Sequence, residues 1–446
     1  MTKINKRLNQ KNRIGNWIHD NPVKAIVIVA ILVRLIVAVL YQHITWYPDS
    51  GDYLHLANRL FDLDLSGYEG QRSPGYPLLI LLTGFSDVLL VVIQSLIGVY
   101  TLVVAYRTML LLRVNRKMSL VTCLFLACYL PIVFFELAVL TETVTLFIIS
   151  LIFYLYFRAI QRNDWCWKNI VSLSLLCGFL ILIKPFYIFF PFVLLFLALM
   201  KKGLKGITWS KTILFLCIPL SVFLGWSYVN KVNTNYFVSS TFYGFNLAQN
   251  CVSFAERTTP EYEDIGNIYV KYRDDRISDK EIAMTIWDAQ TELEVKTGLS
   301  FPDLSNKLYN YSIATIKENP FLYLKQVIIS WSDFWKTSLY WEPQSFGVSE
   351  ASNVFLYICY LERIVLQLIK ILFVILIPVN IYFSIRKRHL TSQLIISLVV
   401  LTASLLQAFA TYGTNSRYSF PFEILIVISV VLNYQQYLTY KKKKTA

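Results

Sequence analysis

The heptapeptide Tyr47-Pro-Asp-Ser-Gly-Asp-Tyr53 opens the first long polar gap in a chain that otherwise consists mainly of apolar runs, and the turn Arg72-Ser-Pro-Gly-Tyr-Pro77 follows in the same gap. Asp49 and Asp52 come directly after the first apolar run, so they lie at a bilayer surface if that run crosses a membrane. Carboxylates are not required to keep such a loop hydrated, so two of them at this surface indicate a chemical role.

The composition predicts an all-α integral membrane protein. Of the 446 residues, 56% are hydrophobic and 16% are charged, whereas a soluble domain has about 25% charged residues. Apolar runs of roughly 20 residues recur along the chain. The net charge of +14 comes from basic residues in short segments between these runs. This distribution indicates membrane topology and contact with membrane lipids, not a nucleic-acid partner.

The basic segments predict about ten transmembrane helices with both termini in the cytoplasm. The first basic segment is residues 3–13, and the others are 113–117, 158–168, 201–211, 386–388 and 441–444. The expected spans are about 24–41, 88–107, 119–135, 142–157, two within 165–200, 212–228, 361–385, 390–410 and 420–437. Residues 165–200 form two crossings because basic segments flank them on both sides. The break falls at Lys184-Pro185, since a residue before proline avoids the helical region.

Three units are expected. Residues 1–229 form an N-terminal membrane module with about seven spans, and its outer loop 42–87 carries an interfacial helix near 50–63, capped by Asp49 or Ser50. Residues 230–354 form an outer helical domain, rich in acidic residues, with helices near 279–297, 304–318 and 321–335. Its aromatic residues either pack a core or stack on sugar rings, and packing is favoured. Residues 355–446 form a C-terminal membrane module with a basic tail.

This topology brings charged residues from separate connections to the outer face: Asp49, Asp52, Arg72, Glu136, Glu142, Lys184 and Arg417. They form a site, or each lies alone among lipid headgroups and water. Arg34, near the middle of the first span, is either buried against neighbouring helices or reaches the site. Cys251 and Cys359 fall in or beside the outer region, and their spacing leaves a disulfide open.

The charged set suits a substrate that carries a phosphate. Lys184 and Arg417 are the residue types that hold a phosphate, and arginine does so through its planar fork. A phosphate whose charge is held is a good leaving group, so the remaining requirement is a base for an acceptor hydroxyl. Asp49 is the candidate base. Asp52 or Glu142 would assist, or Asp49 and Asp52 would hold a divalent cation, Mg or Mn, through oxygen ligands.

These residues resemble the GT-C superfamily of membrane glycosyltransferases, near the protein O-mannosyltransferases and the lipid A aminoarabinose transferases. The matching motifs are Asp49-x-x-x-Tyr53-x-x-x-Ala57, Arg72-Ser-Pro-Gly-Tyr-Pro77, Leu140-Thr-Glu-Thr143, Lys184-Pro185, Glu318-Asn-Pro320 and Arg417-Tyr418. The first motif matches the place of the family's catalytic aspartate. The chain departs from many relatives at Ser50, where they have a second acid, because its second acid is Asp52.

The resemblance implies a catalytic role for Asp49, with Asp52 beside it. It also implies a substrate-binding set, namely Tyr53, Arg72, Tyr76, Glu142, Lys184 and Arg417. The implied activity is transfer of a sugar from a polyprenyl-phosphate carrier to a hydroxyl of a lipid, glycan or protein acceptor. The expected location is a bacterial plasma membrane, with the active site facing outward.

Two other functions stay open at this stage. A secondary transporter also combines charged residues with broken helices, although it places them at mid-membrane depth and often shows paired repeats. A non-catalytic or polymerase-like protein of envelope polysaccharide assembly also has a large outer loop. It would not need the set of Asp49, Arg72, Lys184 and Arg417.

Overall fold

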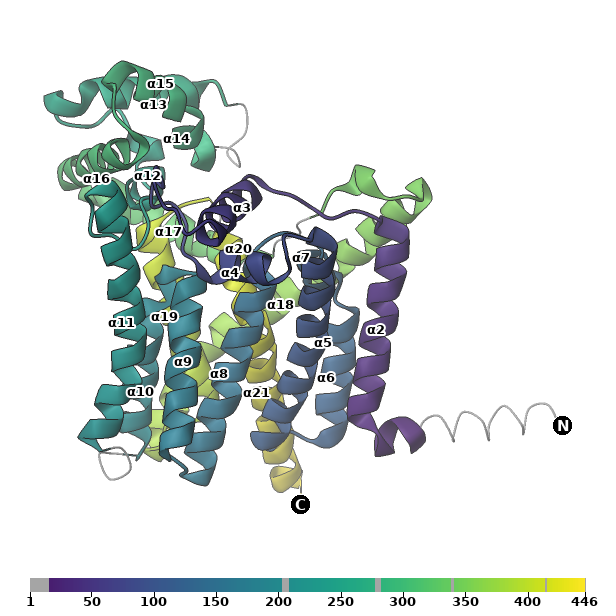
Figure 1. The fold of residues 1–446 in the computed structure, drawn as a ribbon. Coiled ribbons are helices and arrows are strands. Elements are labelled where there is room, and N and C mark those ends of the chain that lie inside the picture. Colours follow the sequence, from purple (N-terminus) through teal and green to yellow (C-terminus); the bar gives the residue numbers. More distant parts are fainter. Residues whose placement is uncertain (1–15, 203–207, 277–281, 338–340, 414, 446) are drawn as a thin grey trace.

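The computed structural model describes residues 16–202, 208–276, 282–337, 341–413 and 415–445, and Figure 1 shows the fold. Helices make up the described part, whose only extended pairing is an isolated parallel bridge between Thr45 and Ala138. Long helices lie side by side, and shorter helices gather at the end drawn at the top, which we call the upper end (Figure 1). The predicted basic segment at residues 3–13 lies outside the described residues.

The bundle helices are α2 (Pro22–Tyr41), α5 (Asp87–Leu111), α6 (Arg116–Cys128), α7 (Leu130–Glu136), α8 (Glu142–Arg162), α9 (Trp167–Ile183), α10 (Phe189–Lys202), α11 (Trp209–Thr234), α18 (Ser349–Lys387), α19 (Ser392–Ala410) and α21 (Glu423–Thr445). Among the described residues, seven helices are long and apolar enough to cross a membrane. The pair α6–α7, bent by 53°, would be an eighth crossing, and α9 and α10 are shorter apolar helices. The protein is therefore an all-α, multi-pass membrane protein, as predicted. Ten spans with both termini inside stay a prediction.

The break at Lys184-Pro185 is present. Lys184 has extended backbone angles, φ −141° and ψ 106°, between the end of α9 and the 3-10 turn η1 (Pro185–Ile188). The pyrrolidine ring of Pro185 disfavours a helical conformation at the preceding residue, which explains why the helix ends there. Lys184 therefore leaves the helical path at the tip of the α9–α10 connection.

Helix α3 (Pro48–Phe61) carries the two aspartates, and it begins earlier than predicted. The N-cap is Tyr47, so the expectation that Asp49 or Ser50 caps the helix was wrong. Pro48 explains the difference, because proline fits the first helical position and carries no N–H to satisfy. Ser50 Oγ accepts a hydrogen bond from Tyr47 N at 3.0 Å and donates one to Val139 O at 2.8 Å. Ser50 is thus fully buried, and the Asp49 carboxylate is left for other partners.

A second hydrophobic cluster lies in the α12–α17 segment, which comprises α12 (Tyr243–Gln249), α13 (Glu263–Asp274), α14 (Thr285–Asp288), α15 (Gln290–Thr297), α16 (Phe301–Glu318) and α17 (Pro320–Phe334). The rings of Phe245 and Trp287 stack with centroids 4.6 Å apart, so aromatic packing builds this cluster. The helices expected near 304–318 and 321–335 match α16 and α17, whereas α12 and α13 were not predicted. Part of the helix expected near 279–297 lies outside the described residues. The unit boundaries at 229/230 and 354/355 stay predictions.

The disulfide left open from the sequence does not form. Cys251 lies in the cluster of the α12–α17 segment, and Cys359 lies in a separate cluster with Phe134 and Phe346. Both thiols are buried and free.

Candidate active site

Six charged residues form one connected network at the upper end. Asp49 and Asp52 come from α3, Glu142 is the first residue of α8, and Arg417 lies on the short helix α20 (Asn415–Ser419). Arg72 precedes α4 (Gly75–Leu82), and Lys184 stands at the break after α9. Apart from Glu136, every residue of the predicted outer-face set belongs to this network.

Arg72 lies between the two aspartates of α3. Its Nη2 is 2.7 Å from Asp49 Oδ1 and 2.9 Å from Asp52 Oδ2, and its Nε donates to Asp52 Oδ2 at 3.1 Å. The guanidinium also lies over two aromatic rings, 5.0 Å from the centroid of Tyr53 and 4.5 Å from that of Phe242. The planar guanidinium fork is thus held by carboxylates at its edge and by rings on its faces.

Glu142 holds the two remaining cations. Its Oε1 accepts a hydrogen bond from Lys184 Nζ at 3.0 Å and two from Arg417, from Nε at 3.0 Å and from Nη2 at 2.9 Å. Arg417 Nη1 also donates to Asp49 Oδ2 at 2.9 Å. Arg417 therefore connects the Glu142–Lys184 pair to the Asp49–Arg72–Asp52 group.

Exposure divides the acids into two kinds. The Glu142 side chain is fully buried, whereas 26% of the Asp49 side chain and 34% of the Asp52 side chain are exposed. Lys184 and Arg417 keep 14% and 13% exposed. An incoming molecule can therefore reach Asp49, Asp52 and the edges of the two cations, while Glu142 stays behind them.

The charges around Asp49 govern its protonation. Burial raises the pKa of the Asp49 carboxyl, but the guanidinium groups of Arg72 and Arg417 outweigh burial and hold the pKa well below its usual range. Asp49 is therefore ionised across the physiological pH range. A carboxylate held by two guanidinium groups is also a weak base, because its affinity for a proton is low.

Tyr53 and Tyr76 form a buried layer beneath Arg72. Their rings meet edge to face, with centroids 5.1 Å apart, and Tyr76 is fully buried. The Tyr76 hydroxyl donates to Gln94 Oε1 at 2.9 Å, and Gln94 Nε2 donates to the carbonyls of Glu136 and Ala138, each at 2.9 Å. This chain of contacts fixes α3 and α4 to the end of α7.

Glu136 does not join the network. It is fully buried and pairs with Arg34 on α2, with Arg34 Nη2 2.5 Å from Glu136 Oε1. Of the two interpretations of Arg34, burial against neighbouring helices is the one observed. Gly98 on α5 makes room for this pair, because a Cβ there would lie 1.8 Å from Glu136 Oε1. The pair braces the segment that carries Val139, the partner of Ser50.

The acids of the network do not fit the divalent cation site that the sequence suggested. The Arg72 guanidinium occupies the space between Asp49 and Asp52, and Ser50 turns inward, away from both. The described part of the chain contains no group of three or more His, Cys, Asp or Glu residues that could hold a metal ion. Hard divalent cations normally take six or more oxygen ligands, with several from carboxylates or water.

Residues that the sequence analysis missed, just before α12, support Arg72. Besides the Phe242 ring, Ser240 Oγ donates to Gln71 O at 2.8 Å and Thr241 N donates to Gly70 O at 2.9 Å. These residues lie about 170 positions from Arg72 in the sequence. No local pattern signals such a contact.

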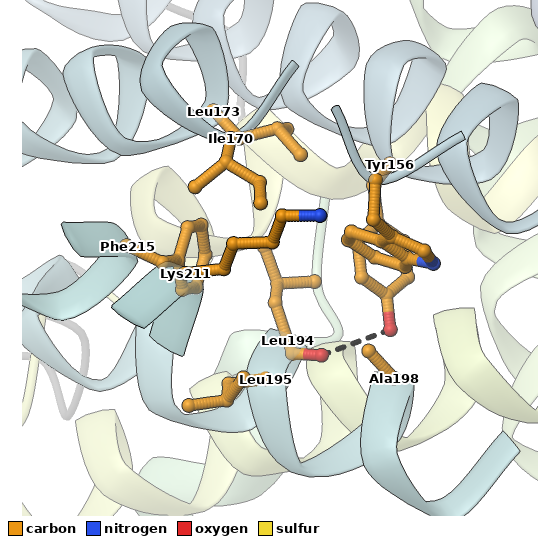
Figure 2. A pocket seen from close by; sticks show the side chains of 9 residues that line it. Tyr156, Ile170, Leu173, Leu194, Leu195, Ala198, Lys211 and Phe215 are labelled. Carbon is orange, nitrogen blue, oxygen red and sulfur yellow. Dashed lines mark hydrogen bonds between the residues drawn. The ribbon is translucent and has the colours of Figure 1, made fainter. Parts of the chain in front are cut away.

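A small cavity lies outside this network, among α8, α9, α10 and α11 (Figure 2). It measures about 20 Å³ and has an apolar lining apart from Lys211, whose side chain reaches into it. The nearby Tyr156 hydroxyl donates to Leu194 O at 2.9 Å. A space of this size holds roughly one water molecule and is too small for a substrate.

No known family of protein sequences and no curated protein sequence matches the chain. Two solved structures of the oligosaccharyltransferase AglB from Archaeoglobus fulgidus are similar to it. One is tethered to an acceptor peptide, with a TM-score of 0.45 over 92% of this chain, and the other holds an inhibitory peptide and a dolichol-phosphate, with a TM-score of 0.47 over 96%. Both are 11% identical, and the chain spans about half of their length, 50% and 52%.

A third similar structure is ArnT from Cupriavidus metallidurans bound to undecaprenyl phosphate. It is 14% identical, with a TM-score of 0.37 over 92% of this chain and 77% of ArnT. AglB and ArnT are GT-C glycosyltransferases, the superfamily that the sequence motifs resemble. At these identities and TM-scores, the similarity assigns neither a family nor a substrate to this chain.

Proposed function

We propose that the protein is a glycosyltransferase that moves a sugar from a polyprenyl-phosphate carrier to an acceptor hydroxyl. The observation that carries the proposal is the bridge made by Arg417, which touches the half-buried Asp49 on one side and the buried Glu142, with Lys184, on the other. One side offers a carboxylate to a hydroxyl, and the other offers cations to a phosphate. Both sit at the upper end of an apolar bundle, where a lipid phosphate would lie.

In the proposed step, the acceptor oxygen forms a bond to the anomeric carbon of the sugar. The bond between that carbon and the phosphate oxygen breaks, and the phosphate leaves with the bonding electron pair. Asp49 takes the proton of the acceptor hydroxyl. Lys184 and Arg417 stabilise the negative charge that develops on the leaving phosphate.

The charge balance of the network adds a condition to this mechanism. Three carboxylates are paired with three cations, so the formal charges cancel and a donor phosphate must compete with a carboxylate for its cation. Glu142 is fully buried, whereas Asp49 is partly exposed, so the bond between Asp49 and Arg417 is the one that yields. Loss of one guanidinium raises the pKa of Asp49 and makes it a better base once the donor is bound.

The other predicted residues take supporting roles in this proposal. Glu142 holds Lys184 and Arg417 in place from behind, and Tyr53 and Tyr76 support Arg72. Asp52 is the most exposed acid of the network, at 34%, and it meets the acceptor beside Asp49. The acceptor class stays open between lipid, glycan and protein. The location in a bacterial plasma membrane, with the network facing outward, is part of the proposal.

The structure offers less support to the two alternatives. Two oppositely charged pairs inside the described part of the bundle, Arg34 with Glu136 and Lys370 with Glu423, are bonded within themselves, which leaves neither pair open for a transported solute. A non-catalytic assembly protein would not need Arg417 to connect the partly exposed Asp49 carboxylate to the Glu142–Lys184 pair.

Purified protein in proteoliposomes tests the proposal. With polyprenyl-phosphate sugars of several kinds as donors, wild-type protein should convert at least one of them to polyprenyl phosphate when an envelope extract supplies the acceptor. Asp49→Asn should abolish most of this conversion. Asp62→Asn is the matched control, because Asp62 is an exposed acid at the other end of α3. Equal loss in both variants, or no conversion by wild-type protein, would contradict the proposed activity.

A further inference from the structure

A second ion pair lies inside the bundle, beneath the network. Lys370 on α18 is fully buried, and its Nζ is 2.8 Å from Glu423 Oε1, at the start of α21. The same ammonium donates to Ser419 Oγ at 2.9 Å and to the carbonyl of Lys336 at 2.9 Å. Three acceptors thus surround the three donors of one buried lysine.

These contacts converge on the segment that carries Arg417. Ser419 is two residues after Arg417 and ends α20, and Glu423 follows the 3-10 turn η7 (Phe420–Phe422). Lys336 lies just after α17. Lys370 therefore ties three elements together: α18, the end of α17 and residues 416–423.

Helix α20 needs such support. It is five residues long, and a helix of this length has little stability of its own. Gly413, two residues before it, has a φ of +113°, a backbone conformation that residues other than glycine rarely adopt. The ring of Phe420 packs on Phe135 with centroids 4.1 Å apart, which anchors the far end of the segment. The bond between Lys370 and Ser419 is a polar anchor close to Arg417.

Burying two charges is costly, and a buried ion pair contributes little net stability compared with apolar residues of similar size. A pair with three well-formed bonds at this place therefore indicates a geometric role. We infer that Lys370, together with Glu423, is a positioning residue that holds residues 416–423 so that Arg417 reaches Asp49 and Glu142 at once. This role rests on the proposed function, because Arg417 is taken to bind the donor phosphate.

Binding of undecaprenyl phosphate to purified protein in nanodiscs tests the role. Lys370→Met alone would leave Glu423 as an unpaired buried carboxylate and endanger folding. The double variant Lys370→Met/Glu423→Gln removes both charges. Ser419→Ala removes the two hydrogen bonds of Ser419 Oγ, from Lys370 Nζ and to Ser416 O, and keeps both charges of the pair. Arg363→Met is the control. Arg363 lies on α18 and donates to the carbonyl of Thr337, next to Lys336, at 3.2 Å.

Arg417→Ala should weaken binding about ten- to a hundredfold, as expected for lost charged hydrogen bonds. The double variant should lose affinity to a similar extent, and Ser419→Ala by a few fold, whereas Arg363→Met should bind like wild type. Adding Arg417→Ala to the double variant should cost little more, because both changes remove the same interaction. Thermal unfolding, measured alongside, separates lost positioning from lost stability.

Additive losses, or normal binding by the double variant, would overturn the positioning role. If the double variant does not fold, Ser419→Ala decides: binding equal to wild type would overturn the role. Failure of the proposed function gives a different pattern, in which wild-type protein does not bind the lipid phosphate or Arg417→Ala binds it normally.

Discussion

Arg417 Nη1 lies 2.9 Å from Asp49 Oδ2, although the two residues are 368 positions apart in the chain. The same guanidinium is bonded to Glu142, which also holds Lys184. Arg417 therefore joins the acid proposed as the base to the group proposed to bind phosphate. The planar geometry of the Arg417 guanidinium is therefore as important for these contacts as its charge.

Arg417→Lys should weaken binding of undecaprenyl phosphate about ten- to a hundredfold. Lysine keeps the positive charge but loses the planar fork, so it cannot stay bonded to Glu142 while it binds the phosphate in place of Asp49. Isothermal titration or a fluorescent lipid-phosphate assay measures the change. The control is Arg273→Lys. Arg273 lies on α13, has a similar exposure to Arg417 and pairs with Glu256. Binding by Arg417→Lys equal to wild type would show that the fork is not needed.

Phe242→Leu should lower the rate of transfer about two- to thirtyfold, because a cation–π contact of about 0.5–2 kcal/mol beneath Arg72 is lost. Phe242→Tyr keeps the ring and should retain most of the activity. Phe237→Leu is the control, since Phe237 is close in sequence and 51% exposed. Steady-state kinetics measure the transfer rates. Equal rates for Phe242→Leu and wild type would show that Phe242 does not support Arg72.

Cysteines placed at Ser66 and Glu263 should react with a membrane-impermeant thiol reagent in intact cells, whereas one at Asn115 should not. The first two positions belong to segments at the upper end, and the α5–α6 connection lies at the opposite end (Figure 1). The exposed Cys128, Cys166 and Cys217 are replaced by serine beforehand. Reaction at Asn115 in unbroken cells would contradict the predicted orientation.

The difference in thermal stability between wild type and Asp49→Asn should stay constant from pH 8 to pH 5. Burial raises the pKa of Asp49, but Arg72 and Arg417 lower it more, to below its usual value of about 4. A lowered folded-state pKa adds stability that is complete above the unfolded pKa and is lost as the pH falls through the folded pKa. Melting curves in detergent measure the difference. A difference that disappears between pH 7 and pH 5 would mean that the pKa of Asp49 is raised.

The sequence predicted which residues meet because membrane topology restricts where loops lie. Basic segments assigned the connections to two sides, and Pro185 explained why Lys184 leaves its helix. Those two rules were enough to bring Asp49, Arg72 and Lys184 to one end of the bundle. They carry no information about how each helix is rotated about its axis.

Helix rotation and long-range packing account for what could not be predicted. Glu136 and Glu142 flank the same short connection, between α7 and α8, yet Glu136 faces Arg34, 102 positions earlier in the chain. Phe242 reaches Arg72 only because the α12–α17 segment packs over it. The helix start at Pro48 was missed because the preference of proline for the first helical position outweighed the capping tendency of Asp49 and Ser50.

The most direct test of the account combines two measurements on Asp49→Asn in proteoliposomes: sugar transfer and binding of undecaprenyl phosphate. Transfer should fall about 10²- to 10⁴-fold, as expected for a lost general base. Binding should be unchanged or up to about tenfold tighter, because an asparagine amide no longer competes with the phosphate for Arg417. Transfer within about threefold of wild type, or binding that is lost together with transfer, would contradict the account.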